Sequence, residues 1–378
     1  MKKVSALNVY FNGFSQKQLV GTLALIENRF AAFEYSNEWL SNGFSISPFS
    51  LPLEKKVFVP EFEPFSGLHG VFNDSLPDGW GRLLVDRLLQ RNGINPHELS
   101  VLDRLAIVGS SGMGALSYEP ESFIGTNYDL PTDLDTLSLE CNRILTTELS
   151  NDDKKNLDAI FLAGGSSGGA RPKIFTKIDD EDWIIKFPSS VDPLNIGKQE
   201  YNYCKTAKKC GIEVSDVKLF ESRKCKGYFG TKRFDRDGKK RIHMVSASAL
   251  LETSHRIPNL DYNTLMLLTL QLTKSNSELL KLYKLMCFNV YAHNRDDHSK
   301  NFSWLFDEQK GIWKLSPAYD LTYSNSIGGE HATTIDGEGL SPKLEHLLCV
   351  AKKAGLKTIE AQNIAKEIEK IVKNDLLM

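Results

Sequence analysis

Short alternating runs of apolar and polar residues open the chain, from Val4 to Tyr35. The pairs Asn12-Gly13 and Glu27-Asn28 separate these runs, and both contain residues that favour turns. Strict alternation places every second side chain on the same face of a strand. The first segment is therefore predicted to form strands of an antiparallel sheet.

Helical spacing replaces this alternation after the turn sequence Leu76-Pro77-Asp78-Gly79. Apolar residues three and four positions apart predict helices over 83–89, 99–107 and 137–149. The stretch from Asn127 to Asp135 carries three aspartates and a proline, and it is predicted to be a connector.

The region from Ala159 to Arg236 predicts strands around one helix. Strands are expected over 182–187 and 228–234, and a helix over 199–210 that ends at a glycine.

Beyond Ser246 the chain is predicted to be mainly helical. Helices are expected over 262–272, 277–292, 342–354 and 358–376, with a β-hairpin over 302–315. A strand-rich half followed by a helical half that holds a polar loop and a hairpin is the plan of a two-lobed kinase. The predicted fold class is therefore α+β, two-lobed and protein-kinase-like.

Composition narrows the class of protein. The 378 residues exceed the size at which one core stops growing, so several domains or subdomains are expected. The 46 basic and 48 acidic residues leave a net charge of −2, which argues against binding nucleic acid through the overall field. No apolar run reaches the length of a membrane span, and no signal peptide is evident. The six cysteines are widely spaced, which is typical of reduced thiols, and a cytoplasmic protein is expected.

The strongest chemical signal is the polar loop from His293 to Asn301, which directly follows a predicted apolar helix. Asp296 and Asn301 are five positions apart, the spacing that kinases use for a catalytic carboxylate and a magnesium ligand. Lys300 could hold the transferred phosphate. One alternative is a solvated loop whose polar residues only cap turns. Another is a zinc site at His293 and His298, although the loop offers no third soft ligand at zinc spacing.

A second carboxylate, Asp320, follows the predicted hairpin in the sequence Tyr319-Asp320-Leu321. Kinases place a second magnesium-binding aspartate after the catalytic loop in the same order. An aspartate after a proline turn more often caps a turn or helix. The interpretation of Asp320 as a magnesium ligand is therefore supported only by its position after Asn301 in the chain.

A glycine-rich stretch from Gly164 to Lys173 could cradle phosphate groups, because glycines let backbone N–H groups approach them closely. A flexible linker is the alternative. The similar stretch from Gly109 to Gly114 has no basic residue nearby and is interpreted as a tight connection. Neither stretch matches the P-loop pattern.

Lys186 stands in the apolar strand Trp183-Ile184-Ile185-Lys186-Phe187. It resembles the kinase strand whose lysine binds the α- and β-phosphates of ATP. A lysine that faces water on an edge strand is the alternative, and the order of the motifs favours the functional interpretation.

Taken together, these motifs resemble the HipA-type serine/threonine kinases, the toxins of bacterial toxin–antitoxin pairs. The resemblance is carried by Ser166-x-Gly168-Gly169-Ala170-x-x-Lys173, Lys232-Arg233-Phe234-Asp235-Arg236, His293-Asn294-x-Asp296-x-His298-x-Lys300-Asn301-Phe302 and Pro317-x-Tyr319-Asp320. In the N-terminal part, Ser75 to Arg82 and Val108 to Leu116 resemble the family's N-terminal subdomain, so the resemblance spans nearly the whole chain.

The resemblance implies a role for each matching residue. Asp296 would be the catalytic aspartate, and Asn301 and Asp320 would hold Mg²⁺. The remaining nucleotide contacts would come from Gly168, Gly169, Ala170, Arg171, Lys173 and Lys186 at the phosphates, Lys232, Arg233 and Phe234 beside adenine, and His298 near the nucleotide. Ser166 would be the autophosphorylation site, with Ser167 as the second choice. Phosphorylated Ser166 is expected to expel the loop and to stop ATP binding.

The resemblance also implies partners. Family members phosphorylate aminoacyl-tRNA synthetases and pair with a HipB-like helix-turn-helix antitoxin, through which they reach DNA indirectly. The expected organisation is a HipA-like N-terminal subdomain over 1–125, a kinase N-lobe over 126–236 and a helical C-lobe over 237–378. Two other functions remain open: a catalytically silent corepressor that binds an antitoxin, and a small-molecule kinase of the aminoglycoside phosphotransferase type.

Overall fold

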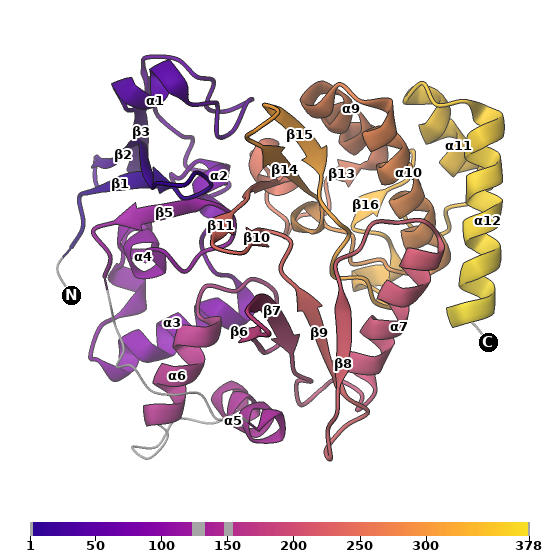
Figure 1. The fold of residues 1–378 in the computed structure, drawn as a ribbon, viewed down its shortest axis with the longest axis horizontal. Coiled ribbons are helices and arrows are strands. Elements are labelled where there is room, and N and C mark those ends of the chain that lie inside the picture. The colour runs from indigo at the N-terminus through magenta and orange to yellow at the C-terminus, as the bar shows by residue number, and fades with distance from the viewer. Residues whose placement is uncertain (1–2, 123–132, 147–153, 377–378) are drawn as a thin grey trace. The chain divides into compact units, whose positions relative to one another are not determined.

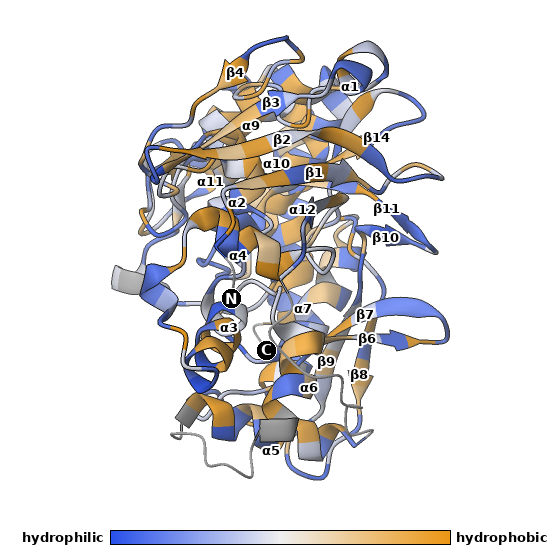
Figure 2. Cartoon of the chain, turned by 90° about the vertical axis from the view of Figure 1, so that its left-hand side faces the viewer, coloured by the Kyte–Doolittle hydropathy of each residue, from blue (hydrophilic) through white to orange (hydrophobic). Residues whose placement is uncertain are grey.

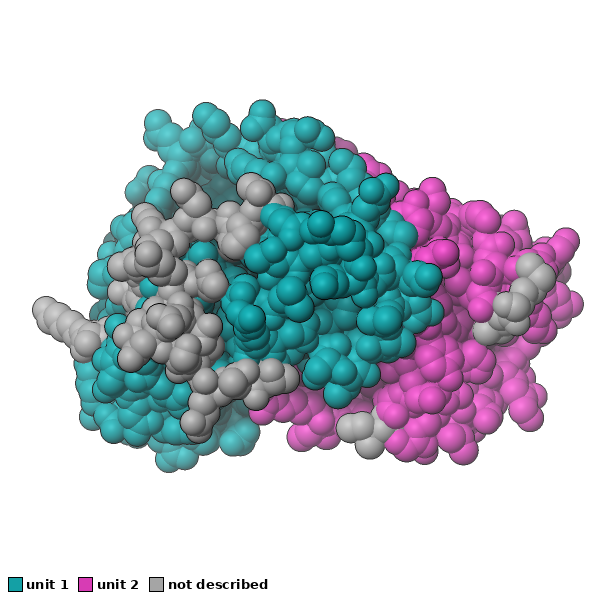
Figure 3. Space-filling view, turned by 90° about the horizontal axis from the view of Figure 1, so that it is seen from below, with its two compact units in different colours: residues 1–197, 218–245, 249–252 teal, residues 198–217, 246–248, 253–378 magenta. Residues whose placement is uncertain are grey.

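The structure is a computed structural model that describes residues 3–122, 133–146 and 154–376. The chain forms two compact units (Figure 3). Unit 1 comprises residues 1–197, 218–245 and 249–252, and unit 2 comprises residues 198–217, 246–248 and 253–378. Residues 127–132 of the expected connector and 147–149 of the expected helix lie outside the described residues. The three-part division at residues 125 and 236 stays a prediction.

Unit 1 begins with a five-stranded sheet in the order β4-β3-β2-β1-β5, and its strands pair antiparallel (Figure 1). The strands are β1 (Ala6–Phe11), β2 (Gln18–Ile26), β3 (Phe30–Tyr35), β4 (Val57–Phe58) and β5 (Leu116–Glu119). Alternate residues of β1, namely Leu7, Val9 and Phe11, are buried. The alternation in the sequence therefore predicted the first three strands correctly.

The helices that follow in the described part of unit 1 include α1 (Asn37–Asn42), α2 (Gly70–Asn73), α3 (Gly79–Arg91), α4 (Val101–Val108), α5 (Leu134–Thr146) and α6 (Lys154–Gly164). Helices α3 and α4 and the described part of α5 confirm three predictions. Helix α6 corrects another, because strands were expected from Ala159 onward. Leu157, Ile160 and Phe161 lie on one face of α6 and join a buried cluster with residues of α3, so helical spacing was present there.

A second sheet of unit 1 has the strand order β6-β7-β9-β8. Its strands are β6 (Lys173–Ile178), β7 (Glu181–Lys186), β8 (Val217–Phe220) and β9 (Tyr228–Lys232), and a hairpin of β10 (Arg236–Asp237) and β11 (Lys240–Arg241) follows them. Figure 2 shows that the turn joining β6 and β7 is hydrophilic. Both strands predicted in this region are confirmed.

The start of α3 packs closely against the glycine-rich stretch that precedes β6. The backbone N–H of Trp80 donates to the Gly169 carbonyl at 2.8 Å, and its indole N–H donates to the Lys173 carbonyl at 3.0 Å. Gly79 has a φ of +41°, and a side chain there would overlap the Gly169 carbonyl. A methyl group at Gly81 would overlap the Ser167 carbonyl. Only glycines permit this approach.

Unit 2 is mainly helical. Its elements include most of α7 (Ile196–Lys209), then α9 (Tyr262–Thr273), α10 (Asn276–Tyr291), α11 (Leu344–Lys353) and α12 (Thr358–Leu376). Helix α10 packs against α9 and α12, and β14 (Ser303–Asp307) pairs with β15 (Ile312–Leu315) in the predicted hairpin. Strand β13 (Leu260–Asp261) pairs parallel with β16 (Thr333–Thr334). The segment that joins the two units carries β12 (His243–Ser246) and α8 (Ala247–Leu250).

Two expectations from composition can be compared with the structure. Four of the six cysteines are buried, and Cys225 and Cys349 are partly buried. None of the described helices is both long enough and apolar enough to cross a membrane.

Gly81→Ala should destabilise unit 1, although alanine normally stabilises a helix interior by about 1 kcal/mol relative to glycine. The new methyl group would push against the Ser167 carbonyl, and overpacking of this kind costs about 1–3 kcal/mol. Chemical denaturation would measure the change. Gln90→Ala, at an exposed position near the other end of α3, is the control and should change stability by less than about 0.5 kcal/mol. A stabilised Gly81 variant would contradict the packing described here.

Acidification below pH 6.5 should destabilise unit 1 through two buried histidines. Burial lowers the pKa of His69 and of His243 to about 4, and hydrogen bonds with the backbone of Phe58 and Ile46 only partly oppose it. Between pH 6.5 and about 4 the unfolded chain binds protons that the folded chain excludes, so the free energy of unfolding falls as pH falls.

Each histidine contributes up to about 1.4 kcal/mol per pH unit in that window. Thermal unfolding midpoints measured from pH 7 to pH 5 would show the decline. His243→Phe removes one of the two groups and should reduce this pH dependence, whereas an unchanged dependence would show that His243 does not contribute.

Candidate functional site

The polar loop after α10 exposes one acidic side chain and buries the next. The side chain of Asp296 is 61% exposed, whereas Asp297 is buried. The side-chain amide of Asn301 donates to the backbone carbonyl of Asp296 at 2.6 Å, across a short 3₁₀ turn over Ser299–Asn301. The backbone of Asp296 is thereby held, while its carboxylate reaches solvent.

His298 lies beside the Asp296 carboxylate. Its Nδ1 accepts the backbone N–H of Lys300 at 3.2 Å, so the neutral ring carries its proton on Nε2. Nε2 lies 4.0 Å from Oδ1 of Asp296. The ring therefore presents a proton toward the exposed carboxylate.

The segment that carries Asp320 is bonded directly to this loop. The hydroxyl of Tyr319 donates to the carbonyl of Lys300 at 2.6 Å and also contacts the Ser303 hydroxyl at 2.6 Å. Asp320 itself has a φ of +53°, in the left-handed region that non-glycine residues rarely adopt. Such a conformation persists only where neighbouring contacts impose it, and it is common at functional sites.

The side chains of Asn301 and Asp320 suit a hard cation. The Asn301 amide nitrogen is used on Asp296, which leaves its Oδ1 oxygen as the ligand atom, and Asp320 supplies a carboxylate. Oxygen ligands of this kind favour Mg²⁺ over zinc. In the part of the chain that the structure describes, no three His, Cys, Asp or Glu side chains are grouped so that they could hold a metal.

The glycine-rich loop is held on unit 1 by polar contacts. The Gly169 N–H donates to the Asp78 carboxylate, and the Lys173 ammonium donates to the Gly168 carbonyl at 2.5 Å. Gly168, Gly169 and Ala170 are exposed at the tip of this loop. The tip is therefore accessible while its backbone is fixed at both ends.

Both candidate phosphorylation sites are buried in this loop. The Ser166 hydroxyl donates to the Ser111 carbonyl at 2.8 Å, and the Ser167 hydroxyl donates to the Gly164 carbonyl at 2.6 Å. Ser166 is 8% exposed and Ser167 is 1% exposed. Either hydroxyl must leave its carbonyl before it can be phosphorylated.

Two lysines stand opposite each other where this loop enters the second sheet. Lys173 of β6 and Lys186 of β7 are cross-strand partners, so their side chains start from the same face. The Lys186 ammonium lies 5.5 Å from the centre of the Phe229 ring, on the next strand. Like charges placed directly opposite each other repel, so an anion bound near both lysines would reduce their repulsion.

The other predicted nucleotide residues are engaged with protein groups. Arg171 donates to Asp192 at 3.2 Å, and Lys232 pairs with Glu181. The guanidinium of Arg233 forms two hydrogen bonds with Asp235, at 2.9 and 2.8 Å. Phe234 is half-buried. The side chain of Arg233 therefore has a structural role.

Sequence reasoning missed two contributors to these sites. Asp78 was interpreted only as part of a turn, yet its carboxylate binds the glycine-rich loop. Asp297 has no role in the predicted motif, yet it is the buried anchor of the polar loop. The role of Asp78 could have been suspected from the sequence, because Asp78 directly precedes Gly79 and lies close to Gly81. The sequence held no such signal for Asp297.

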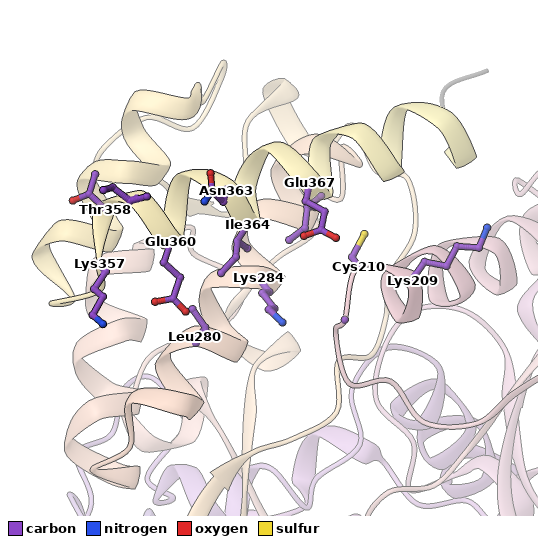
Figure 4. A pocket seen from close by; sticks show the side chains of 13 residues that line it. Lys209, Cys210, Leu280, Lys284, Lys357, Thr358, Glu360, Asn363, Ile364 and Glu367 are labelled. Carbon is purple, nitrogen blue, oxygen red and sulfur yellow. The ribbon is translucent and has the colours of Figure 1, made fainter.

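A surface pocket of about 920 Å³ lies elsewhere on unit 2, where the ends of α7, α10 and α12 meet (Figure 4). Its charged lining residues are Lys209, Lys284, Lys357, Glu360 and Glu367. None of the predicted site residues lines it, so this cavity is separate from the candidate chemistry.

Two protein-family models match this chain, one in its N-terminal part and one in its C-terminal part. Residues 7–119 match the HipA N-terminal domain, and residues 165–375 match the HipA-like C-terminal domain. The second match alone covers more than half of the chain and includes both the glycine-rich loop and the polar loop.

Individual relatives cover most of the chain. A protein of Sinorhizobium fredii named "Putative kinase Y4mE" is 27% identical over 399 residues, which is 96% of this chain and 86% of that protein. The HipA protein of Shewanella oneidensis, solved with HipB and operator DNA, matches 98% of this chain and 91% of its own, with 18% identity and a TM-score of 0.69. The Helicobacter pylori kinase CtkA matches 54% of this chain and 90% of its own, with 13% identity and a TM-score of 0.38.

The similarity to the Shewanella structure confirms the predicted α+β, HipA-like fold. Matches to both family domains extend over the regions that carry the motifs. The chain therefore belongs to the HipA family of kinases.

Proposed function

We propose that this protein is an ATP-dependent serine/threonine-protein kinase. Gly168 to Lys173 and Lys186 would contact the phosphates, and Asn301 and Asp320 would hold Mg²⁺. When bound, the metal would neutralise charge on the phosphate oxygens.

Asp296 would act as the catalytic base. The serine or threonine oxygen of the acceptor attacks the γ-phosphorus, the bond from that phosphorus to the bridging oxygen of ADP breaks, and the acceptor proton passes to the Asp296 carboxylate. Lys300, next to Asn301 on the same turn, would stabilise charge on the transferred group. His298 would keep the carboxylate oriented from its position 4.0 Å away.

The observation that carries this proposal is the exposed carboxylate of Asp296 on a fixed backbone. A general base must reach the acceptor and must hold its position while it does so. The 61% exposure of its side chain meets the first need, and the 2.6 Å bond from Asn301 to its carbonyl meets the second.

The partners follow by similarity. The Shewanella HipA structure was solved with HipB and operator DNA, which supports a HipB-like helix-turn-helix antitoxin as a partner of this chain, with DNA contacted through the antitoxin. By the same resemblance, we propose a toxin role and a protein acceptor in translation, such as an aminoacyl-tRNA synthetase.

Asp296→Asn should abolish phosphoryl transfer while leaving the fold intact. The amide keeps the shape of the side chain but cannot accept the acceptor proton, and losing a general base lowers kcat by about 10²- to 10⁴-fold. Transfer of radioactive phosphate from ATP, together with a thermal melt of the same preparation, would measure both effects.

Glu360→Gln is the matched control, because it makes the same carboxylate-to-amide change in unit 2 at the separate pocket (Figure 4). It should leave transfer unchanged. Full activity of the Asp296 variant would refute its role as the base. A wild type that binds antitoxin but transfers no phosphate would favour the silent corepressor, and transfer to a free alcohol alone would favour the small-molecule kinase.

The wild type should also phosphorylate Ser166 in its own glycine-rich loop. Ser166 is closer to the surface than Ser167, and its hydroxyl is bonded to a carbonyl outside the loop, so releasing the loop frees it. The phosphate adds about two negative charges where anionic phosphates of ATP must bind, so nucleotide affinity should fall. Intact-mass analysis and nucleotide titration of the modified protein would measure both.

Ser166→Ala should remove the added phosphate, and Ser167→Ala should retain it. The reverse pattern would move the modification to Ser167. Undiminished ATP affinity in the phosphorylated protein would show that the loop still binds nucleotide after modification.

A further inference from the structure

Asp297 follows the exposed Asp296 directly in the chain but is only 1% exposed. Its Oδ2 atom accepts hydrogen bonds from the Tyr262 hydroxyl at 3.0 Å and from Nδ1 of His331 at 2.9 Å. Its Oδ1 atom accepts the backbone N–H of Thr333 at 3.2 Å, and its backbone carbonyl accepts the Thr333 hydroxyl at 2.5 Å. Asp297 is therefore joined both to α9 and to the segment around β16.

Most of the groups around this carboxylate donate to it. The backbone N–H of Thr333 can only donate, and the Tyr262 oxygen already accepts the Asn289 side-chain amide at 3.0 Å, so its own proton points to Asp297. Burial, together with the nearby Asp297 charge, raises the pKa of Tyr262 well above its usual value, which keeps that hydroxyl a donor. When the Asp297 carboxylate is ionised, Nδ1 of His331 is the donor in their 2.9 Å hydrogen bond.

The same two stretches of chain are bonded at other points. The Ser324 N–H donates to the His293 carbonyl, and the Ala332 N–H donates to the Arg295 carbonyl, each at 3.0 Å. The segment over 324–333 follows Asp320 closely in the chain. The loop that carries the exposed carboxylate and the segment that follows Asp320 are therefore hydrogen-bonded at several points, and the Asp297 carboxylate takes part in these bonds.

We propose that Asp297 and His331 are positioning residues, which hold the Asp296 carboxylate in register with Asp320 through their buried hydrogen bond. This inference rests on the proposed kinase function, because it assigns the two residues to the same site. Neither can touch a substrate, since Asp297 is 1% exposed and His331 is 3% exposed. Their effect on the reaction must pass through the backbone of the loop.

His331→Phe tests this directly, because it keeps the ring but removes the donor to Asp297. A small displacement of a catalytic group can cost about 10²-fold in rate, so kcat should fall by about 10- to 100-fold. The KM for ATP should change little, because the groups proposed to bind the phosphates lie in unit 1. His331→Asn keeps an N–H donor near the same position and should recover most of the loss.

His243→Phe is the matched control, because it makes the same substitution at a histidine that is 1% exposed in unit 1. It should affect stability without this loss of kcat. Asp297→Asn should reduce kcat at least as much as His331→Phe, since an amide nitrogen would face donors. The double variant should be no worse than Asp297→Asn alone, because both changes remove one interaction.

Hydrogen–deuterium exchange of the amides over 293–302 gives a measurement that needs no activity. Exchange should be faster in the His331→Phe variant than in the wild type, and unchanged in the His243→Phe variant. Unchanged exchange with unchanged kcat would overturn the positioning role. If the wild type transfers no phosphate, the kinase proposal fails by itself, and exchange alone then decides whether the pair holds the loop.

Discussion

A carboxylate that is buried away from water must be surrounded by hydrogen-bond donors, and this constraint organises the loops of both units. In unit 1, Asp235 is fully buried and accepts hydrogen bonds from Arg233, Arg236 and the Gly114 N–H. Burial alone would raise its pKa, but the two guanidinium groups hold it well below the usual range. In unit 2, Asp297 has the corresponding place in the polar loop.

The Asp235 cluster extends to the stretch from Gly109 to Gly114. Arg241 donates to the carbonyls of Ser110 at 2.8 Å, Gly112 at 2.9 Å and Gly114 at 2.8 Å, so three backbone acceptors of a tight turn are satisfied by one side chain. Another carbonyl of the same turn, that of Ser111, accepts a hydrogen bond from the Ser166 hydroxyl. The glycine-rich loop thus depends on a second glycine-rich turn, which has a structural role and needs no lysine.

The two neighbouring carboxylates of the polar loop have opposite environments. The side chain of Asp296 faces solvent, whereas that of Asp297 is buried in unit 2. The buried side chain fixes the backbone from which the exposed one projects. The proposed catalytic carboxylate and the buried anchor are therefore neighbours in the chain, and the direction of one side chain is tied to that of the other.

The sequence by itself determined the type and place of most elements and the order of the motifs. Alternation and helical spacing are local properties, and they identified the first strands, helices α9, α10 and α12, and the hairpin of β14 and β15. The spacing from Asp296 to Asn301 is also local, which is why the candidate base and metal ligand could be named.

Only the tertiary structure decided which polar residues anchor the loops. Asp78 meets Gly169 across 91 positions, and His331 meets Asp297 across 34, distances over which no periodicity carries information. It also decided that Arg233 serves an ion pair and that α6 is a helix packed on α3. A carboxylate in a sequence has the same chemistry whether it becomes exposed or buried, and the surrounding donors, which come from distant segments, determine which of the two it is.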